Sequence, residues 1–483
     1  MKKKKKPMNI KNIPFSAVAV CMVLLLNGCS SIINSRKQKA PVVQAYLDGN
    51  NERALSMVDM RLVFARYSGD ELMWLVESGA LNFYLKNYDE CIKNFSRAEE
   101  LIGGYDKRAL VSVRDFNSEV ATGVTNLNSL PYKGWCRDRI LLSVLKSLSY
   151  LGTGRESAFR AQLRRLRDTQ KQVIENYKEY FEAEKRAMAR TRNKNRAALK
   201  KQGLDMEFDS ELEYVKEVAH QGYGNFLNPL AIFLSGLGAI RDKQYENARI
   251  EFQRLYEAMP DSGLAQKYYV TCLKKTNREI PEKLKDVAEF DFELGGSVVF
   301  ILFANGRGAA LKQIALHFPV MAAWPVCEYF SKPYDHLNVA VDGKTLKTEL
   351  LANMDGILSQ EYIERLPGIV ARIVISTVVK ETATYGGAYA AGRANELAGA
   401  LVYLGATVYR YVFNTADTRC WEFLPKEYQL AQFPLPENKT FSISPSNEAF
   451  EKEIKLSDEC RAAIIYVNTP SRKNFTCNIL EFH

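Results

Sequence analysis

The segment LSGLGAIRDKQYENARIEFQRLYEAMP, residues 234–260, carries the strongest structural signal in the chain. Its marker residues follow one another at intervals of 12, 4 and 8 positions and are Gly236, Ala248, Phe252 and Pro260. Small residues at the first two positions let two antiparallel helices approach closely, and the aromatic ring fills the groove to the next pair. The proline ends the second helix. The segment therefore predicts a tight helical hairpin.

This spacing resembles that of the tetratricopeptide repeat (TPR), a helical hairpin that stacks into a solenoid. Tyr245, just before the second helix, also stands at a position of that motif. A weaker copy lies earlier in the chain, with a cysteine where alanine is usual and Gly103 where proline is usual. The residues of this copy are Gly79, Tyr88, Cys91, Phe95 and Ala98.

Helical periodicity extends over residues 41–280, where we expect an all-α TPR-like domain. A third helix pair, 139–151 and from 156 onward, lacks the full pattern. About three pairs are needed for stability because one pair cannot bury its own face. The helix pairs favour a short solenoid whose concave groove binds a protein or peptide. The alternative is a helical bundle in which the same residues only pack.

The most charged stretch, residues 155–201, holds 15 Lys and Arg against 6 Asp and Glu. Apolar residues recur in it at close to helical spacing, so a basic helical arm is expected at about 155–215. Such an arm could contact lipid head groups or an anionic polymer. The simpler interpretation is an exposed helical hairpin kept soluble by its charge.

After Pro281 the pattern changes from helical to alternating, and residues 290–483 predict an α+β domain with an antiparallel sheet. The dipeptides Asn305-Gly306 and Asp342-Gly343 each predict a β-hairpin, since both turn positions tolerate positive φ. Helices are expected at 360–381 and 392–413, and the final strands at 440–444, 461–468 and 475–482.

The chain begins with the pattern of a bacterial lipoprotein signal peptide, residues 1–28. A lysine-rich head precedes the apolar run Phe15–Leu26, and Gly28 supplies the small residue before Cys29, whose thiol would take the lipid. The apolar run is shorter than the roughly 17–25 residues that cross a bilayer. A transmembrane anchor is therefore disfavoured.

Cys29 is accordingly expected to begin the mature chain, with residues 29–40 as a tether. Ser30 stands where an aspartate would favour the inner membrane, so we expect the outer membrane, facing the periplasm. The net charge falls from +10 to +4 when the six lysines of the signal are removed. That value does not indicate a nucleic-acid partner. The expected partners are the membrane, through the lipid, and a protein.

Seven cysteines remain once Cys21 and Cys29 are set aside, and an odd number cannot form a complete disulfide framework. Their wide spacing shows no zinc-binding pair, so no metal or cofactor is expected. Cys460 and Cys477 flank the last expected hairpin and are the candidate disulfide in an oxidising periplasm. With only four histidines and no catalytic signature, the sequence does not indicate an enzyme.

Three segments together resemble a family of bacterial tetratricopeptide-containing lipoproteins of unknown function. They are Asn228-Pro229 through Ala248, Phe303-Ala304-Asn305-Gly306, and Ala416 to Trp421 followed by Leu424-Pro425 and Pro434-Leu435-Pro436. The resemblance covers most of the mature chain. It implies the same architecture and the same location, and it brings no activity with it.

Asp417, Arg419 and Trp421 admit two interpretations. They could form a binding site for a carboxylate or a sugar, with the indole as a stacking platform. They could also lock the loop, with the arginine paired to a carboxylate and the indole in the core. For the whole chain, we expect a lipid-anchored scaffold or adaptor in cell-envelope biogenesis. The alternative is a glycan- or cell-wall-binding protein, a hydrolase included, with its site in the C-terminal domain.

Overall fold

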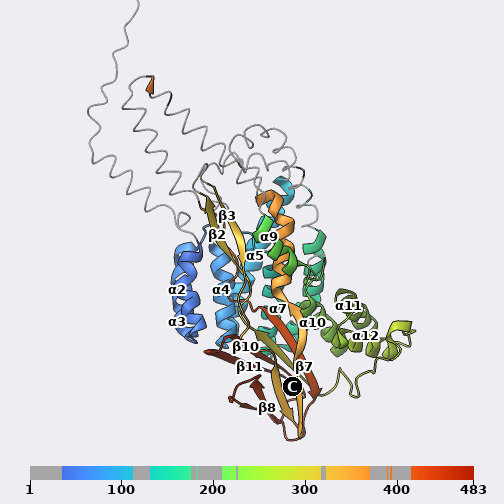
Figure 1. Cartoon of the computed structure of the whole chain (residues 1–483). Coiled ribbons are helices and arrows are strands. Elements are labelled where there is room, and N and C mark those ends of the chain that lie inside the picture. Colours follow the sequence, from blue (N-terminus) through green and yellow to red (C-terminus); the bar gives the residue numbers. More distant parts are fainter. Residues whose placement is uncertain are drawn as a thin grey trace, which may run out of the picture.

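The computed structural model of the chain describes residues 35–112, 131–175, 209–224, 227–316, 322–369 and 415–483, with isolated positions 182, 186, 389, 392 and 393. Helices occupy the described part up to residue 275, and mostly antiparallel sheets follow it (Figure 1). The prediction of helices followed by a sheet-rich region is therefore confirmed.

Successive helices form antiparallel hairpins that stack in one layer, with α2 and α3 at one end of the row and α11 and α12 at the other (Figure 1). The helices are α2 (Ser35–Leu47), α3 (Asn51–Ala65), α4 (Glu71–Tyr84), α5 (Tyr88–Ser112), α7 (Cys136–Gly152), α9 (Asp209–Ala219), α10 (Pro229–Arg241), α11 (Tyr245–Ala258) and α12 (Gly263–Lys275). Residues 156–175 and 354–369 are also helical. Asn228 caps α10 by accepting two backbone N–H hydrogen bonds, and Pro229 occupies the first turn, where its missing N–H costs nothing.

The strands form a five-stranded sheet in the order β11-β10-β1-β7-β6, a four-stranded sheet in the order β5-β4-β8-β9, and the separate pair β2-β3. Their bounds are β1 (Val298–Asn305), β2 (Ala310–Leu316), β3 (Ala322–Glu328), β4 (Leu337–Val341), β5 (Lys344–Lys347), β6 (Glu349–Asn353), β7 (Glu427–Pro434), β8 (Thr440–Pro445), β9 (Lys452–Lys455), β10 (Ala462–Ser471) and β11 (Asn474–Phe482). The pairing of β1 with β10 is parallel, and the other pairings are antiparallel.

The fold has three layers because β1 is buried on both faces. Phe300 and Leu302 point to the helices and belong to a core that extends from α2 to β11. Val299 and Ile301, which alternate with them, point to the four-stranded sheet and belong to a second core. This alternation follows from the two-residue period of a strand.

The expected boundary after residue 280 therefore does not separate two cores. Helices and sheet share the larger core, so the change from helical to alternating pattern marks a change of layer. The expected tether over residues 29–40 also ends earlier than predicted, since residues 35–40 lie in α2 and Lys39 is buried there.

One of the two predicted hairpins is confirmed and the other is wrong. Asp342 and Gly343 both have positive φ and join β4 to β5, with Val341 opposite Lys344. At Asn305-Gly306 the chain turns, but β2 pairs with β3 and not with β1. The fully buried β1 needs a neighbour on each side, and β10 and β7 supply them.

The strands expected near the end of the chain are confirmed as β8, β10 and β11. The signal peptide, Cys29, most of the 392–413 helix and most of the basic arm lie outside the described residues. The first part of that arm, helical residues 156–175, packs into the core through Phe159 and Leu163. Within the described ranges, the structure contains no helix with the length and apolar character to span a bilayer.

Candidate functional site

The two helical hairpins singled out in the sequence share one packing contact. Gly79 in α4 lies against the ring of Phe95 in α5, with no room for a side chain. Gly236 in α10 lies in the same way against Phe252 in α11, where an added Cβ would be 2.7 Å from a ring carbon. Both contacts join residues sixteen positions apart, so the same spacing produces the same close approach in α4/α5 and α10/α11.

The remaining marker residues also lie where helices meet. Tyr88 lies against Gly152 of α7, so its ring fills the groove to the next hairpin. Cys91 is fully buried and accepts a hydrogen bond from Ser149 of α7 at 3.1 Å. Ala98 and Ala248 are fully buried too, while Pro260 follows the end of α11 and Tyr245 begins it.

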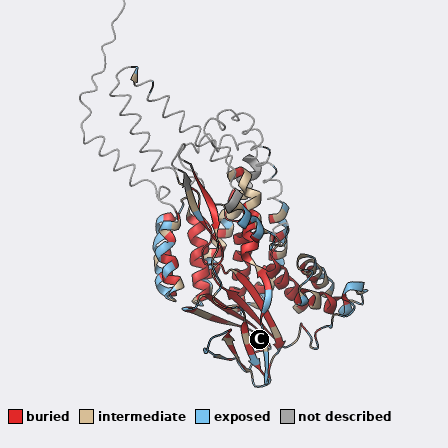
Figure 2. Ribbon diagram, in the orientation of Figure 1, coloured by how far each residue is buried: buried red, intermediate tan, exposed pale blue. Residues whose placement is uncertain are grey.

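The inner face of the helical layer, expected to form a partner-binding groove, is covered by the chain's own sheet and by the loop that precedes β7. Every residue of α4 is buried (Figure 2). Tyr84 donates a hydrogen bond to the Phe423 carbonyl at 2.8 Å, and Asn478 of β11 donates one to the Phe83 carbonyl at 2.7 Å. A partner would therefore have to bind at another surface of the layer.

The structure favours the structural interpretation of Asp417, Arg419 and Trp421. Arg419 is buried and forms ion pairs with Asp417 at 2.8 Å and with Asp70, the residue before α4, at 2.9 Å. Trp421 is only 1% exposed and packs on Phe95. The arginine is already paired within the chain and the indole offers no face to a sugar, so the ligand-binding interpretation of these residues is wrong.

Sequence reasoning missed a chain of buried charges beside this loop. Lys39 in α2 donates to Glu77 in α4 at 2.5 Å and to the Cys420 carbonyl at 2.6 Å. Glu77 also accepts the backbone N–H of Glu422, whose carboxylate pairs with Arg307 at 2.5 Å. Burial, the largest single effect, lowers the pKa of Lys39, but Glu77, Cys420 and Glu422 together outweigh it, and the net effect is a raised pKa. The lysine stays charged and ties α2 to α4.

The proposed disulfide is also wrong. Cys460 and Cys477 are both free and buried. Cys477 in β11 pairs with Val467 in β10. Val467 lies seven positions after Cys460 in the sequence. From Ala462, where β10 begins, to Val467 the strand alone spans roughly 17 Å at about 3.3 Å per residue, far beyond the reach of a disulfide.

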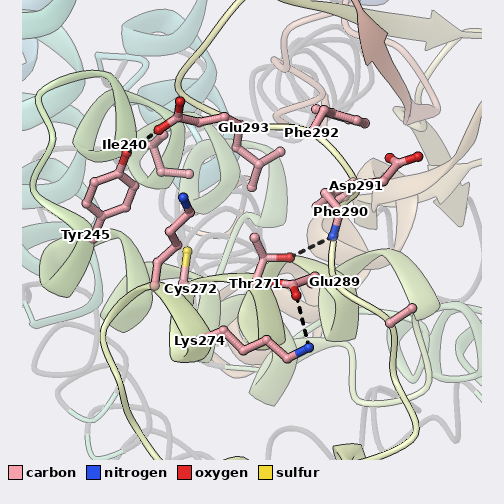
Figure 3. Close-up of a pocket in the computed structure, with 13 residues that line it drawn as sticks. Ile240, Tyr245, Thr271, Cys272, Lys274, Glu289, Phe290, Asp291, Phe292 and Glu293 are labelled. Carbon is pink, nitrogen blue, oxygen red and sulfur yellow. Dashed lines mark hydrogen bonds and ion pairs between the residues drawn. The ribbon is translucent and has the colours of Figure 1, made fainter.

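A pocket of about 590 Å³ opens where the last hairpin meets the segment leading to the sheet (Figure 3). The end of α10, the start of α11 and one face of α12 form one side, and residues 288–294 form the other. Three hydrogen bonds join the sides: Tyr245 donates to Glu293, Lys274 donates to Glu289, and the Phe290 N–H donates to Thr271, each at 3.2 Å.

The pocket is lined by a thiol and a phenol that stay protonated at neutral pH and by charged side chains of both signs. Burial raises the pKa of the Cys272 thiol to about 12, so the thiolate is absent at neutral pH. Burial and the neighbouring Glu293 also raise the pKa of Tyr245. No histidine is among the lining residues, while lysines of α12 face carboxylates of residues 289–293. Exposed Lys275 and Asp291 add one charge of each sign.

A second pocket, of about 480 Å³, lies beside the end of β11. It is lined by Ser297, Lys439, Asp458, Glu459, Cys460, Arg461 and His483. The lining contains no Trp, Tyr or Phe ring on which a sugar could stack. Over the described ranges, no cluster of histidine, cysteine or carboxylate side chains is arranged to hold a metal ion.

Comparison with known proteins returns no match to any family model, to any curated protein or to any solved structure.

Proposed function

We propose that this chain is a non-catalytic, lipid-anchored protein of the bacterial envelope that holds a protein partner near the outer membrane. The mixed-charge pocket at the end of the helical row carries this proposal. It combines three aromatic rings, two lysines and three carboxylates, and the segment 288–294 forms one of its sides. Such a surface suits an extended peptide, whose side chains and amides can be paired along it.

The helix pairs are the scaffold that positions this pocket. We propose that they are TPR-like repeats, on the strength of the glycine–aromatic contact that recurs in α4/α5 and α10/α11. Because the chain's own sheet covers their inner face, the end of the row takes the place of the usual concave groove. The proposed envelope location rests on the signal pattern and on Cys29.

Site-specific photocrosslinking in intact cells tests the pocket. A benzophenone side chain introduced at Lys275 should give one discrete protein adduct, and the Asp291→Lys change should remove that adduct by altering the charge of the pocket. The same probe at Lys347, which is exposed on β5, is the matched control and should give no such adduct. Equal adducts at both positions would contradict a specific site.

The anchor is tested separately. Metabolic labelling with a fatty-acid analogue should mark the wild-type chain and leave the Cys29→Ala variant unlabelled. The alternative function, binding of a glycan or the cell wall, would be favoured if the chain sediments with purified peptidoglycan and the Asp458→Asn/Glu459→Gln variant does not. We expect no such sedimentation.

A further inference from the structure

An apolar stripe on α3 is left exposed to solvent. Met60, Val63 and Phe64 are 60%, 72% and 80% exposed, and Tyr67 in the following turn is 80% exposed. The intervals of three and four residues place the first three side chains on one face of the helix. Figure 2 shows this outer end of the helical row in pale blue. A soluble surface gains nothing from such a cluster, which marks an interaction site.

Tyr67 is held in place by an unusual backbone conformation. Its φ of 65° lies in the left-handed region, which aromatic residues rarely adopt. Its N–H donates to the buried Glu71 carboxylate at 2.9 Å, which fixes the turn with the ring in solvent. Strained residues of this kind cluster at functional surfaces.

The stripe lies close to the proposed point of membrane attachment. Because α2 and α3 are antiparallel and joined by three residues, Ser35 at the start of α2 is level with about Val63. Ser35 lies six positions after Cys29, and six extended Cα-to-Cα steps span at most about 21 Å. A lipid on Cys29 would therefore hold this end of the helical row within about 21 Å of the bilayer.

Basic side chains lie at the same end of the helical row as the stripe. Lys37, Arg61 and Arg66 are exposed at the same end of α2 and α3. The Arg66 guanidinium lies 5.4 Å from the centroid of the Tyr67 ring. Apolar and aromatic groups with a basic rim are the composition of helices that lie in the membrane interface, where the cations meet anionic head groups.

We infer that the face formed by Met60, Val63, Phe64 and Tyr67 inserts into the surface of the phospholipid bilayer that holds the Cys29 lipid. This inference rests on the proposed function for the anchor itself. A single acyl attachment leaves a protein free to tilt, and a second contact fixes its orientation. The pocket at the opposite end of the row then faces away from the membrane.

Vesicle flotation of the mature chain carrying Cys29→Ala tests this face without the lipid. The probe is vesicles of phosphatidylethanolamine with phosphatidylglycerol. We expect the unlipidated chain to float with them, and Phe64→Asp to lower its partition constant by about tenfold or more, because a large apolar group leaves the bilayer boundary. The matched control is Ile250→Asp, at a residue 46% exposed on α11, which should partition like the parent. Equal melting temperatures will show that the variants are folded.

Two results would overturn the inference. The first is that the chain does not bind the vesicles, or that Phe64→Asp leaves its partition constant unchanged. The second is a dimer in vesicle-free solution that Phe64→Asp dissociates, since a second copy of the chain would then be the occupant. Neither result depends on acylation or on the partner, which the labelling of Cys29 and the crosslinking at Lys275 test separately.

Discussion

The rings of Phe95 in α5 and Trp421 in the loop before β7 meet edge to face, with centroids 5.8 Å apart. Phe95 also fills the space beside Gly79, so one ring closes the α4/α5 hairpin and supports the loop. Offset and edge-to-face pairs are favourable beyond the area they bury. The hairpin and the loop are therefore stabilised together.

Trp421→Ala should destabilise the whole chain. Truncating a buried aromatic costs about 3–5 kcal/mol, and here the cavity would lie in the core that helices and sheet share. We expect a single unfolding transition at lower urea, seen alike by circular dichroism of the helices and by tyrosine fluorescence. Ile250→Ala, at a half-exposed position, should change the free energy of unfolding by less than about 0.5 kcal/mol. Separate transitions for helices and sheet would contradict the shared core.

Gly236→Ala should lower the free energy of unfolding by about 1–3 kcal/mol, because the new Cβ forces the Phe252 ring aside. Gly103→Ala is the matched control. Gly103 lies inside α5 with nothing within 4 Å of an added Cβ, so alanine should stabilise the helix by about 0.5–1 kcal/mol. Urea titrations of the two variants give both values. If both variants changed the free energy of unfolding by the same amount, the contact between Gly236 and Phe252 would not contribute to stability.

Lys39→Met should cost about 3–5 kcal/mol because it leaves the Glu77 carboxylate buried without its cation. Replacing both residues, in Lys39→Met/Glu77→Leu, should recover much of this loss. Lys93→Met breaks the exposed pair with Glu90 and should cost less than about 0.5 kcal/mol. A double-mutant cycle from urea unfolding measures the coupling. Little coupling between Lys39 and Glu77 would show that the pair is not what joins α2 to α4.

The buried thiols should make the protein sensitive to alkali. Burial raises the pKa of Cys91, Cys272 and Cys420 to about 12, while an unfolded thiol titrates near 8.5. Between these values only the unfolded state loses protons, so stability should fall as pH rises from about 8.5 to about 12. The free energy of unfolding, measured at several pH values in this range, checks whether stability falls as the pH rises. At pH 7, DTNB should react with these thiols only after denaturant is added.

The helical hairpins were predictable because their signal is local. The 16-residue spacing of Gly236 and Phe252 joins neighbouring helices, and the two-residue turn at Asp342-Gly343 joins neighbouring strands. At Asn305-Gly306 the same local signal predicts a hairpin that does not form. The strands that pair with β1 come from far along the chain. A turn dipeptide specifies that the chain bends and does not specify which strand it meets.

The candidate sites depended on such distant partners and could not be predicted. Arg419 has the chemistry of a ligand-binding group, but it is paired with Asp70, which lies 349 positions away in the sequence. Lys39 is expected in a tether, but in the fold it is buried, where it donates hydrogen bonds to Glu77 and to the Cys420 carbonyl. The pocket of α12 required the segment 288–294 to fold back across the helix, and no spacing rule in the sequence encodes that return.

Asn468 in β10 donates a hydrogen bond to Tyr46 in α2, 422 positions earlier, and β10 is also the inner neighbour of β1. During synthesis on the ribosome, all the helices of the row emerge before β10 and β11. Until those strands arrive, the part of the apolar face of α4 and α7 that β11 contacts stays uncovered. Folding must therefore wait for nearly the whole chain, as it does in proteins dominated by long-range contacts. A stop codon just before β10 would remove little of the chain's length, yet the shortened product would be a substrate for aggregation and proteolysis.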